Sequence, residues 1–405
     1  MSASKSALKT CADWGYANMS DIRLAVVGIG AMGERHALSV AKGQVCGMNL
    51  AAVVAPSEAK RVWAKEQLPG IATYADMESL CASGTVDAVL LASPHSLHAP
   101  QAALAIQHGL HVLTEKPIGT RASEILPIAA EAKAQGLIYC VMFNQRVDPV
   151  NQRIHQVLHS GQLGRLRRVI MMMTNCYRPQ SYFDAGSWRA TWAMEGGGML
   201  VNQCSHRLDL LAWWLGMPER VCVHCGYGKW HDIEVDDDIS AYFAFPGGGT
   251  GHLIASTGDC PGTSLLEFQG DNGKLSLENG RLLWDALEIP EPEFSQTYTG
   301  GFGEPAHTRH DITPAAENPE HLGILQNFAD AIHGIAQPVV PIEEGLRSLR
   351  VTQAMYLSSW TNREVALPAD DAEFDALLAQ RIALSKPRVR KEVKLDLGAL
   401  WSQKR

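Results

Sequence analysis

The feature that most constrains the fold is the alternation of short apolar runs with amphipathic segments in the first 145 residues. The apolar runs have the composition of buried parallel strands, and they lie at residues 22–30, 49–55, 86–94, 111–117 and 137–143. Helical patterns follow from about Met32 and at 57–67, 98–109 and 122–136. This alternation predicts an α/β fold with a doubly wound parallel sheet.

The first predicted strand runs into a glycine motif, Gly28-Ile29-Gly30-Ala31-Met32-Gly33. In a GxGxxG between a strand and a helix, one glycine makes a tight turn, one lets the backbone approach a pyrophosphate, and one permits close helix packing. The N–H groups of the helix N-terminus then hold the phosphates. The motif therefore predicts a NAD or NADP site formed by these six residues.

The end of the second predicted strand bears on the choice of cofactor. Ala55 stands where NAD-preferring sites usually have an acidic residue. The absence of a carboxylate removes repulsion against a ribose phosphate, and nearby cations could pair with such a phosphate. The nearby polar and cationic residues are Arg35, Ser57, Lys60 and Arg61. The pattern favours NADP over NAD, unless Lys60 and Arg61 only form an exposed helix face.

Lys116, in the stretch Thr-Glu-Lys-Pro, follows another predicted strand. Ligands of open α/β sheets bind at the carboxyl ends of the strands, and a lysine there can polarise a substrate oxygen or move a proton. The alternative is a surface lysine at a strand end. The peptide between Lys116 and Pro117 could be cis.

Residues 195–209, Glu-Gly-Gly-Gly-Met-Leu-Val-Asn-Gln-Cys-Ser-His-Arg-Leu-Asp, are expected to open a helix. Asn202, His206 and Asp209 would share one face of this helix, opposite an apolar stripe. That face is either solvated or the wall of an active site. Trp213 on the same face and the three glycines, which permit close approach of a backbone or a ligand, weigh against a solvated face, but both interpretations stay open.

From about Val147 the pattern changes to strand-like runs separated by glycine turns, which indicates a largely antiparallel sheet. We expect four segments. They are an N-terminal extension at 1–20, a Rossmann dinucleotide-binding domain at 21–145, a C-terminal domain for substrate binding and oligomerisation at 146–385, and a basic tail at 386–405. The tail is expected to be solvated.

Composition narrows the possible partners. The net charge of -8 gives no footprint for nucleic acid or an anionic membrane, and no apolar run reaches the ~20 residues of a membrane span. The first twenty residues lack the apolar core of a signal peptide. Nine cysteines show no disulfide framework, which indicates a reducing compartment and a cytoplasmic location. Cys222 and Cys225 have metal-ligand spacing, but without a second pair no metal is expected.

Four segments, GIGAMG, ASPHSLH, TEKP and GGGMLVNQCSHRLDLLAWWLG, occur in this order. Together they resemble the glucose–fructose oxidoreductase/inositol dehydrogenase (Gfo/Idh/MocA) family, over about residues 21–370. The resemblance implies a Rossmann domain followed by an α/β domain with an open, mostly antiparallel sheet. It also implies a homodimer or homotetramer joined through that sheet, and reversible NAD(P)-dependent oxidation of a secondary alcohol on a sugar or cyclitol.

The resemblance also assigns roles to residues. Lys116 and His206 correspond to the proton-handling residues, and Asn202 stands where many members carry Asp. Asn can orient an imidazole, but it cannot stabilise imidazolium as a carboxylate does. Substrate contacts are expected from Lys116, Asn202 and His206 and also from Arg146, Trp188 and Arg189. Further cofactor contacts are expected from Ser93, Pro94, His95, His98, Glu115, Lys116 and Asn144.

The sequence therefore predicts a NAD(P)-dependent sugar or polyol dehydrogenase or reductase acting on a small molecule. Two alternatives stay open. One is a glycosidase that uses NAD for transient oxidation, and the other is a non-catalytic nucleotide-binding regulator. The presence of both Lys116 and His206 argues against the regulator, because a binding module does not need a proton-handling pair.

Overall fold

The computed structural model describes residues 16, 19–388 and 391, and this part of the chain divides into two compact units. The first unit contains the chain up to Glu115 together with residues 126–144 and 319–342. The second unit contains residues 116–125, 145–318 and the chain from Glu343 onward. The chain thus passes between the units several times.

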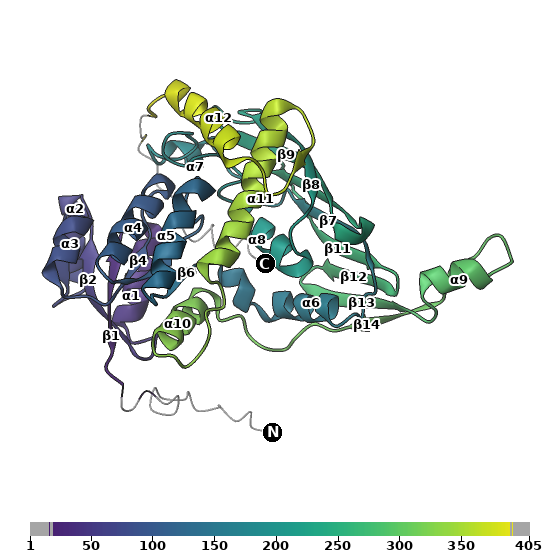
Figure 1. Ribbon diagram of the computed structural model, residues 1–405, viewed down its shortest axis with the longest axis horizontal. Helices are drawn as coiled ribbons and strands as arrows, with labels where there is room; N and C mark the ends of the chain where they lie inside the picture. The colour runs from purple at the N-terminus through teal and green to yellow at the C-terminus, as the bar shows by residue number, and fades with distance from the viewer. Residues whose placement is uncertain (1–15, 17–18, 389–390, 392–405) are drawn as a thin grey trace. The chain divides into compact units, whose positions relative to one another are not determined.

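The first unit is built on a six-stranded sheet of order β3-β2-β1-β4-β5-β6, in which all neighbouring strands are parallel (Figure 1). The order reverses beside β1, as in a doubly wound fold. The strands are β1 (Ile22–Val27), β2 (Met48–Val54), β3 (Ala72–Tyr74), β4 (Ala88–Leu91), β5 (His111–Thr114) and β6 (Tyr139–Val141). The predicted doubly wound parallel sheet is confirmed.

Helices follow most strands of this sheet. They are α1 (Ala31–Ala41), α2 (Glu58–Gln67), α3 (Met77–Ser83), the 3₁₀ turn η3 (His95–Leu97), α4 (His98–Gln107), α5 (Ala122–Ala134) and the late helix α10 (Glu320–Ile332). All four residues of β4 are buried, as expected of a strand covered on both faces. β3 and α3 were not predicted from the sequence, because β3 is three partly exposed residues, Ala-Thr-Tyr, with no apolar run.

Helix α10 joins the first unit although it lies almost 180 residues after β6. Its apolar face, which includes Ile324, Leu325 and Phe328, is buried. Beyond the helix, the N–H of Val141 in β6 donates to the carbonyl of Val340 at 3.0 Å. The side chain of Tyr16 hydrogen-bonds to Asp330 and is buried. This residue of the N-terminal extension therefore packs on its own chain.

The second unit is built on a nine-stranded sheet of order β14-β13-β12-β11-β7-β10-β9-β8-β15. Only β7 and β10 pair in parallel; the other neighbours are antiparallel. The strands are β7 (Leu166–Met173), β8 (Arg220–Tyr227), β9 (Asp236–Ala244), β10 (Thr250–Ser256), β11 (Ser264–Gly270), β12 (Gly273–Glu278), β13 (Arg281–Leu287), β14 (His307–Asp311) and β15 (Val365–Ala366). The expected mostly antiparallel sheet is confirmed.

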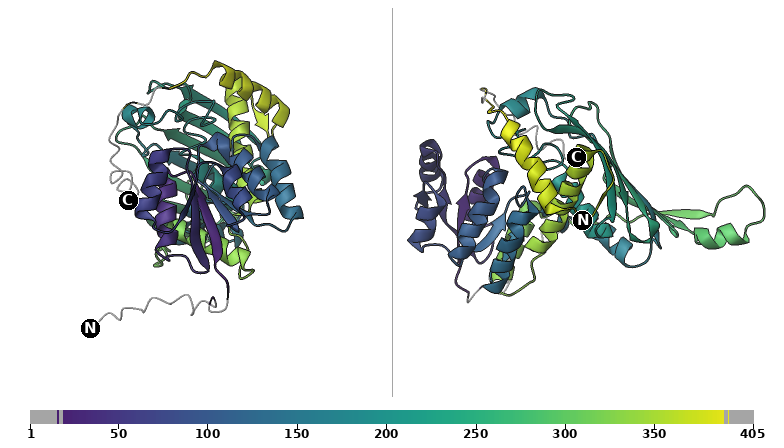
Figure 2. Two further views of the ribbon diagram at one scale, coloured as in Figure 1. Left: turned by 90° about the vertical axis from the view of Figure 1, so that its left-hand side faces the viewer. Right: turned by 45° about the horizontal axis from the view of Figure 1, so that its top comes forward.

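Helices cover one face of this sheet (Figures 1 and 2). On this side Trp214 of α8 packs edge-on against Phe268 of β11, with ring centroids 5.4 Å apart. The helices and turns that lie wholly or mainly in this unit are η4 (Asn144–Val147), α6 (Pro149–His159), α7 (Gln180–Asp184), α8 (Ser205–Leu215), η5 (Pro246–Gly248), α9 (Glu291–Thr297), α11 (Ile342–Thr361) and α12 (Asp371–Leu384). The other face presents side chains such as Ile254, which is 43% exposed.

The strands β13 and β14, with α9 between them, form an arm that extends beyond the rest of this sheet (Figure 2, right). All five residues of β14 are exposed, and Phe302, between α9 and β14, is 97% exposed. At the base of the arm the carboxylate of Asp285 accepts two hydrogen bonds from Arg309, at 2.6 and 2.8 Å.

Four further expectations can be compared with the structure. Cys46 is disulfide-bonded, whereas the sequence showed no disulfide framework and predicted a reducing compartment. Cys222 and Cys225 are free thiols on β8, the strand predicted there, and positions three apart on a strand point to opposite faces. No helix of the described chain is long and apolar enough to cross a bilayer. Of the basic tail, Arg388 and Lys391 pair with Asp184.

Candidate active site

The glycine turn between β1 and α1 has the geometry of a phosphate cradle. Gly28 has a φ of +91°, which favours glycine. A Cβ on Gly33 would lie 1.9 Å from the carbonyl oxygen of Gly28, so close packing requires this glycine. Gly30 has no atom within 4 Å of its missing Cβ, and no side chain caps the N-terminus of α1. The space and the free N–H groups fit a pyrophosphate.

The cations predicted to select NADP lie in three different environments. Arg61 donates from Nη1 to the carbonyl oxygens of Ala55 and Pro56, both at 2.7 Å, so its guanidinium is held at the end of β2. Lys60 pairs with Glu34, and Arg35 pairs with Glu320 at 2.9 Å. Ser57 precedes α2 but makes no capping hydrogen bond with its side chain. Within the described chain, Arg61 alone of the three has no carboxylate partner.

The other predicted cofactor residues of the first unit follow the carboxyl ends of β4, β5 and β6. After β4, the carbonyl of Ser93 lies 2.8 Å from Nε2 of His98, in a turn that contains Pro94 and the buried His95. Directly after β5, the buried carboxylate of Glu115 lies 2.7 Å from Nε2 of the buried His36 on α1. Glu115 therefore ties the end of β5 to the helix that follows the glycine turn.

In the second unit, the three glycines at 196–198 form a turn and not the start of a helix. Helix α8 begins only at Ser205, so the expectation that Asn202, His206 and Asp209 share one regular helix is wrong for Asn202. The cause is the buried Asp236, whose carboxylate accepts from the N–H groups of Gly198 and Leu200 at 2.9 and 2.8 Å.

The glycines are needed because the protein's own atoms come close to them. A Cβ on Gly196 would lie 2.3 Å from the side chain of Thr120, and one on Gly197 would lie 2.1 Å from the hydroxyl of Tyr356. On Gly198 it would lie 2.1 Å from the carbonyl of Asp236. This turn brings residue 202 to the segment that contains Lys116.

Lys116 and Asn202, predicted separately, are in direct contact. Nζ of Lys116 donates to the backbone carbonyl of Asn202 at 2.9 Å and to its side-chain oxygen at 3.1 Å. The side-chain nitrogen of Asn202 donates in turn to the carboxylate of Glu195 at 2.6 Å. The Lys116–Pro117 peptide is cis, as the sequence allowed. A lysine, an amide and a buried carboxyl thus form one connected chain.

Glu195 was not among the predicted site residues. Its second carboxylate oxygen accepts from the N–H of Ala190 at 2.5 Å, and the residue is 3% exposed. Burial raises the pKa of this carboxyl, and the charge of Arg189 partly opposes the shift. In the sequence Glu195 directly precedes the three glycines, and this position beside a constrained turn is the only signal that could have indicated it.

His206 is the second residue of α8 and is half-buried. Asp209, three residues later, is buried and receives two hydrogen bonds from Arg146, at 2.7 and 2.8 Å. Arg146 is itself buried, lies over the ring of Trp213, and also contacts Glu344 at 3.4 Å. Burial opposes the charge of Arg146, but these two carboxylates hold the pKa of its guanidinium above the ordinary value.

This face of α8 is therefore not simply solvated. The predicted substrate residue Arg146 forms an ion pair with Asp209. The predicted cofactor residue Asn144, in the same turn, is buried.

Arg189 and Trp188, the remaining predicted substrate residues, belong to an aromatic cluster. The guanidinium of Arg189 lies 4.6 Å from the ring centre of Tyr182 and 4.7 Å from that of Trp188. Its Nη1 donates to the hydroxyl of Tyr182 at 2.7 Å. Arg189 has no carboxylate within ion-pair distance in the described chain. Its charge is thus held by aromatic rings and a hydroxyl group.

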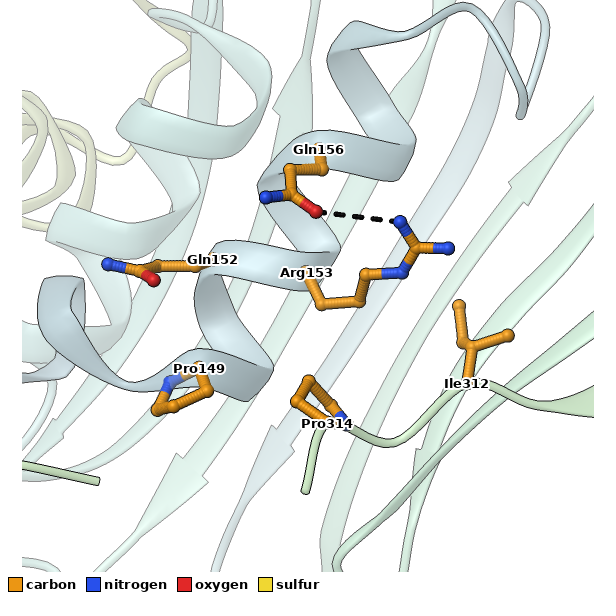
Figure 3. Close-up of a pocket in the computed structure, with 6 residues that line it drawn as sticks. All are labelled: Pro149, Gln152, Arg153, Gln156, Ile312 and Pro314. Carbon is orange, nitrogen blue, oxygen red and sulfur yellow. Dashed lines mark hydrogen bonds between the residues drawn. The ribbon is translucent and has the colours of Figure 1, made fainter. Parts of the chain in front are cut away.

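A separate pocket of about 330 Å³ lies between α6 and the chain that follows β14 (Figure 3). It is lined by Pro149, Gln152, Arg153, Gln156, Ile312 and Pro314. None of the predicted site residues lines it, and its lining contains no carboxylate or imidazole. We therefore place the candidate site at Lys116 and Asn202 and not in this pocket.

Comparison with known families gives two matches that cover most of the chain. Residues 22–143 match the family described as "Oxidoreductase family, NAD-binding Rossmann fold". Residues 155–367 match "Oxidoreductase family, C-terminal alpha/beta domain". Both descriptions belong to the Gfo/Idh/MocA group.

Individual relatives are more distant. The chain is 28% identical to trans-1,2-dihydrobenzene-1,2-diol dehydrogenase of Mus musculus over 293 residues, which are 65% of this chain and 83% of that protein. It is 29% identical to an inositol 2-dehydrogenase of Corynebacterium glutamicum over 196 residues, which are 48% of this chain and only 54%, about half, of that protein.

Among solved structures, the WlbA dehydrogenase from Bordetella pertussis, in complex with NADH and UDP-GlcNAcA, aligns with a TM-score of 0.74. The alignment has 25% identity and covers 87% of this chain and 99% of that one. The family matches, the two sheets and the glycine turn agree with one another. The chain belongs to the Gfo/Idh/MocA family of NAD-binding oxidoreductases.

Proposed function

We propose that this protein transfers a hydride between the nicotinamide of NAD(P) and a secondary alcohol or ketone of a sugar or cyclitol. The observation that carries the proposal is the contact of Lys116 with Asn202. Lys116 follows the carboxyl end of β5, the edge of the sheet at which dinucleotides bind. Its ammonium donates to Asn202, whose amide donates in turn to the buried carboxyl of Glu195.

The dinucleotide supplies the hydride acceptor or donor when it is bound. The glycine turn at residues 28–33 and the N-terminus of α1 hold its phosphates. Lys116 polarises the substrate oxygen, and His206 takes part in moving the hydroxyl proton. Asn202 orients the lysine. This extends its expected role, which was to orient His206 or the substrate.

NADP is the preferred cofactor in this proposal. Ala55 adds no carboxylate at the end of β2, and the Arg61 guanidinium is held there by two backbone carbonyls. A ribose phosphate next to Arg61 would gain a charge-assisted hydrogen bond. Lys60 and Arg35 contribute less, because each is paired with a carboxylate.

We propose that the substrate is a small, sugar-like molecule. The relatives named above are a dihydrodiol dehydrogenase and an inositol dehydrogenase, and the WlbA structure contains UDP-GlcNAcA. Arg189 supports a polar substrate, because no acidic side chain of the described chain occupies the hydrogen-bonding groups of its guanidinium. We propose that Arg189 and Trp188 contact substrate oxygens and a sugar face.

We further propose that the protein is a homo-oligomer joined through the nine-stranded sheet. On the face that carries no helix, Ile254 of β10 is paired with Met172 of β7, and Met172 is paired with Leu265 of β11. This row of apolar side chains is partly exposed in the single chain, and such patches commonly contact another subunit. The disulfide bond at Cys46 argues against the cytoplasmic location that the sequence predicts.

The test is a panel of sugars, cyclitols and sugar acids, each incubated with NAD and with NADP, with absorbance of the reduced nicotinamide as the signal. Reduction of cofactor by at least one member supports the proposal. Release of free sugar from glycosides without net reduction of cofactor would identify the glycosidase alternative. Cofactor binding without turnover on any member would favour the regulator.

A further inference from the structure

The amide group of Asn202 lies between two groups of opposite charge. Its oxygen accepts from Nζ of Lys116 at 3.1 Å, and its nitrogen donates to Oε1 of Glu195 at 2.6 Å. Exchange of the oxygen and nitrogen of this amide would place an NH₂ group against the ammonium and an oxygen against the carboxylate. Both contacts would then be repulsive, so the carboxylate sets the orientation of the amide.

Glu195 can do this because both of its oxygens accept hydrogen bonds from N–H groups. Oε2 accepts from the backbone of Ala190, which cannot change its role, and Oε1 is left to accept from Asn202. A neutral amide at position 195 would have one oxygen and one NH₂ group. One of the two contacts would then bring two donors together.

We propose, on the basis of the function proposed above, that Glu195 is a positioning residue that orients Asn202 and thereby holds the ammonium of Lys116 ready for the substrate oxygen. Glu195 is buried and acts through Asn202. The active site thus obtains its carboxylate from position 195, while position 202 provides only the neutral link to the lysine.

A consequence can be measured without knowing the substrate. The carboxylate and the ammonium interact electrostatically, and an opposite charge nearby favours the charged form of an amine. Loss of the carboxylate should therefore lower the pKa of Lys116. The reactivity of the Lys116 amine towards a small acylating reagent such as acetic anhydride, followed against pH by mass spectrometry of its peptide, reports this pKa.

The decisive variant is Glu195→Gln, with Glu234→Gln as its matched control. The carboxylate of Glu234 also accepts a backbone N–H from the same loop, that of Trp192 at 2.8 Å. Its other hydrogen-bond partners in the described chain are Ser385 and Lys386, and Asn202 is not among them. We expect the labelling curve of Lys116 to move down by about one pH unit in Glu195→Gln and to stay in place in Glu234→Gln. Thermal unfolding of both variants checks that the loop is equally intact.

A second variant tests whether the carboxylate can be moved. Asn202→Asp alone places two carboxyl groups 2.6 Å apart, and these would share a proton. In the double variant Glu195→Gln/Asn202→Asp, the carboxylate faces Lys116 directly. We expect the double variant to recover the labelling curve of the unaltered protein, and to exceed both single variants in turnover on any substrate found in the panel.

The outcomes separate the two proposals. An unchanged labelling curve in Glu195→Gln would overturn the role of Glu195. A double variant whose fold-loss in turnover equals the product of the fold-losses of the two single variants would also overturn it. A shifted curve together with no turnover on any sugar or polyol would leave the positioning role in place and reject the proposed function.

Discussion

The selection of NADP by Arg61 gives the sharpest quantitative prediction. Replacement by alanine removes the guanidinium that two carbonyls hold at the end of β2. A hydrogen bond to a charged group contributes about 1.5–3 kcal/mol. Arg61→Ala should therefore weaken NADP binding about 10- to 150-fold, and NAD binding should change little, because NAD has no phosphate on this ribose.

The assay is calorimetric titration of each cofactor at one fixed, low salt concentration, since screening by salt weakens exposed charge interactions. Lys65→Ala is the matched control. It removes the same charge from the exposed side of the same helix, α2, about one turn further along. It should leave the ratio of the two dissociation constants unchanged.

The reverse change is Ala55→Asp. The new carboxylate would lie beside the guanidinium of Arg61, pair with it and repel a ribose phosphate. It could also accept hydrogen bonds from the ribose hydroxyl groups of NAD. The preference should move towards NAD. If Arg61→Ala weakens NAD and NADP equally, or if the unaltered protein prefers NAD, the guanidinium only supports the turn after β2 and the reasoning is wrong.

Three further predictions concern the site, the stability and the assembly. Lys116→Ala and His206→Ala should each lower turnover about 10²-fold or more while cofactor binding is kept; near-normal turnover in both would remove these residues from the mechanism. Arg146→Ala leaves Asp209 buried without its partner, so urea unfolding should show a loss of about 3–5 kcal/mol, against little change for the more exposed Arg153→Ala; an equal effect of the two would show that the ion pair does not stabilise the fold. Ile254→Glu should dissociate the oligomer in light scattering, and a monomeric unaltered protein at micromolar concentration would refute the assembly.

The fold was predictable where burial produces a simple pattern. Parallel strands covered on both faces must be apolar at every position, as in β4, and so they appear as unbroken runs. The turn at 196–198 was not predictable in the same way. Its N–H groups are held by Asp236, almost forty residues away, and no local pattern shows that contact.

The site was predictable only in part, because several of its contacts join residues that are far apart in the sequence. The resemblance to a family identified Lys116, Asn202 and His206, but not that Asn202 contacts the lysine directly. Glu195 looks like an ordinary polar loop residue, because its burial depends on a turn that only the tertiary structure reveals. Arg146 was expected at the substrate, and no local pattern predicts that its charge is also matched by Asp209, a contact between residues 63 positions apart.

Helix α10 has a consequence for the order in which the protein can fold during synthesis. The first unit is incomplete until residues 319–342 have left the ribosome, since Ile324, Leu325 and Phe328 fill part of its interior. A fragment that ends near residue 145 would expose the surface that these side chains cover, and would invite chaperone binding or aggregation. To produce the cofactor-binding unit alone, residues 319–342 would therefore have to be fused to the N-terminal fragment.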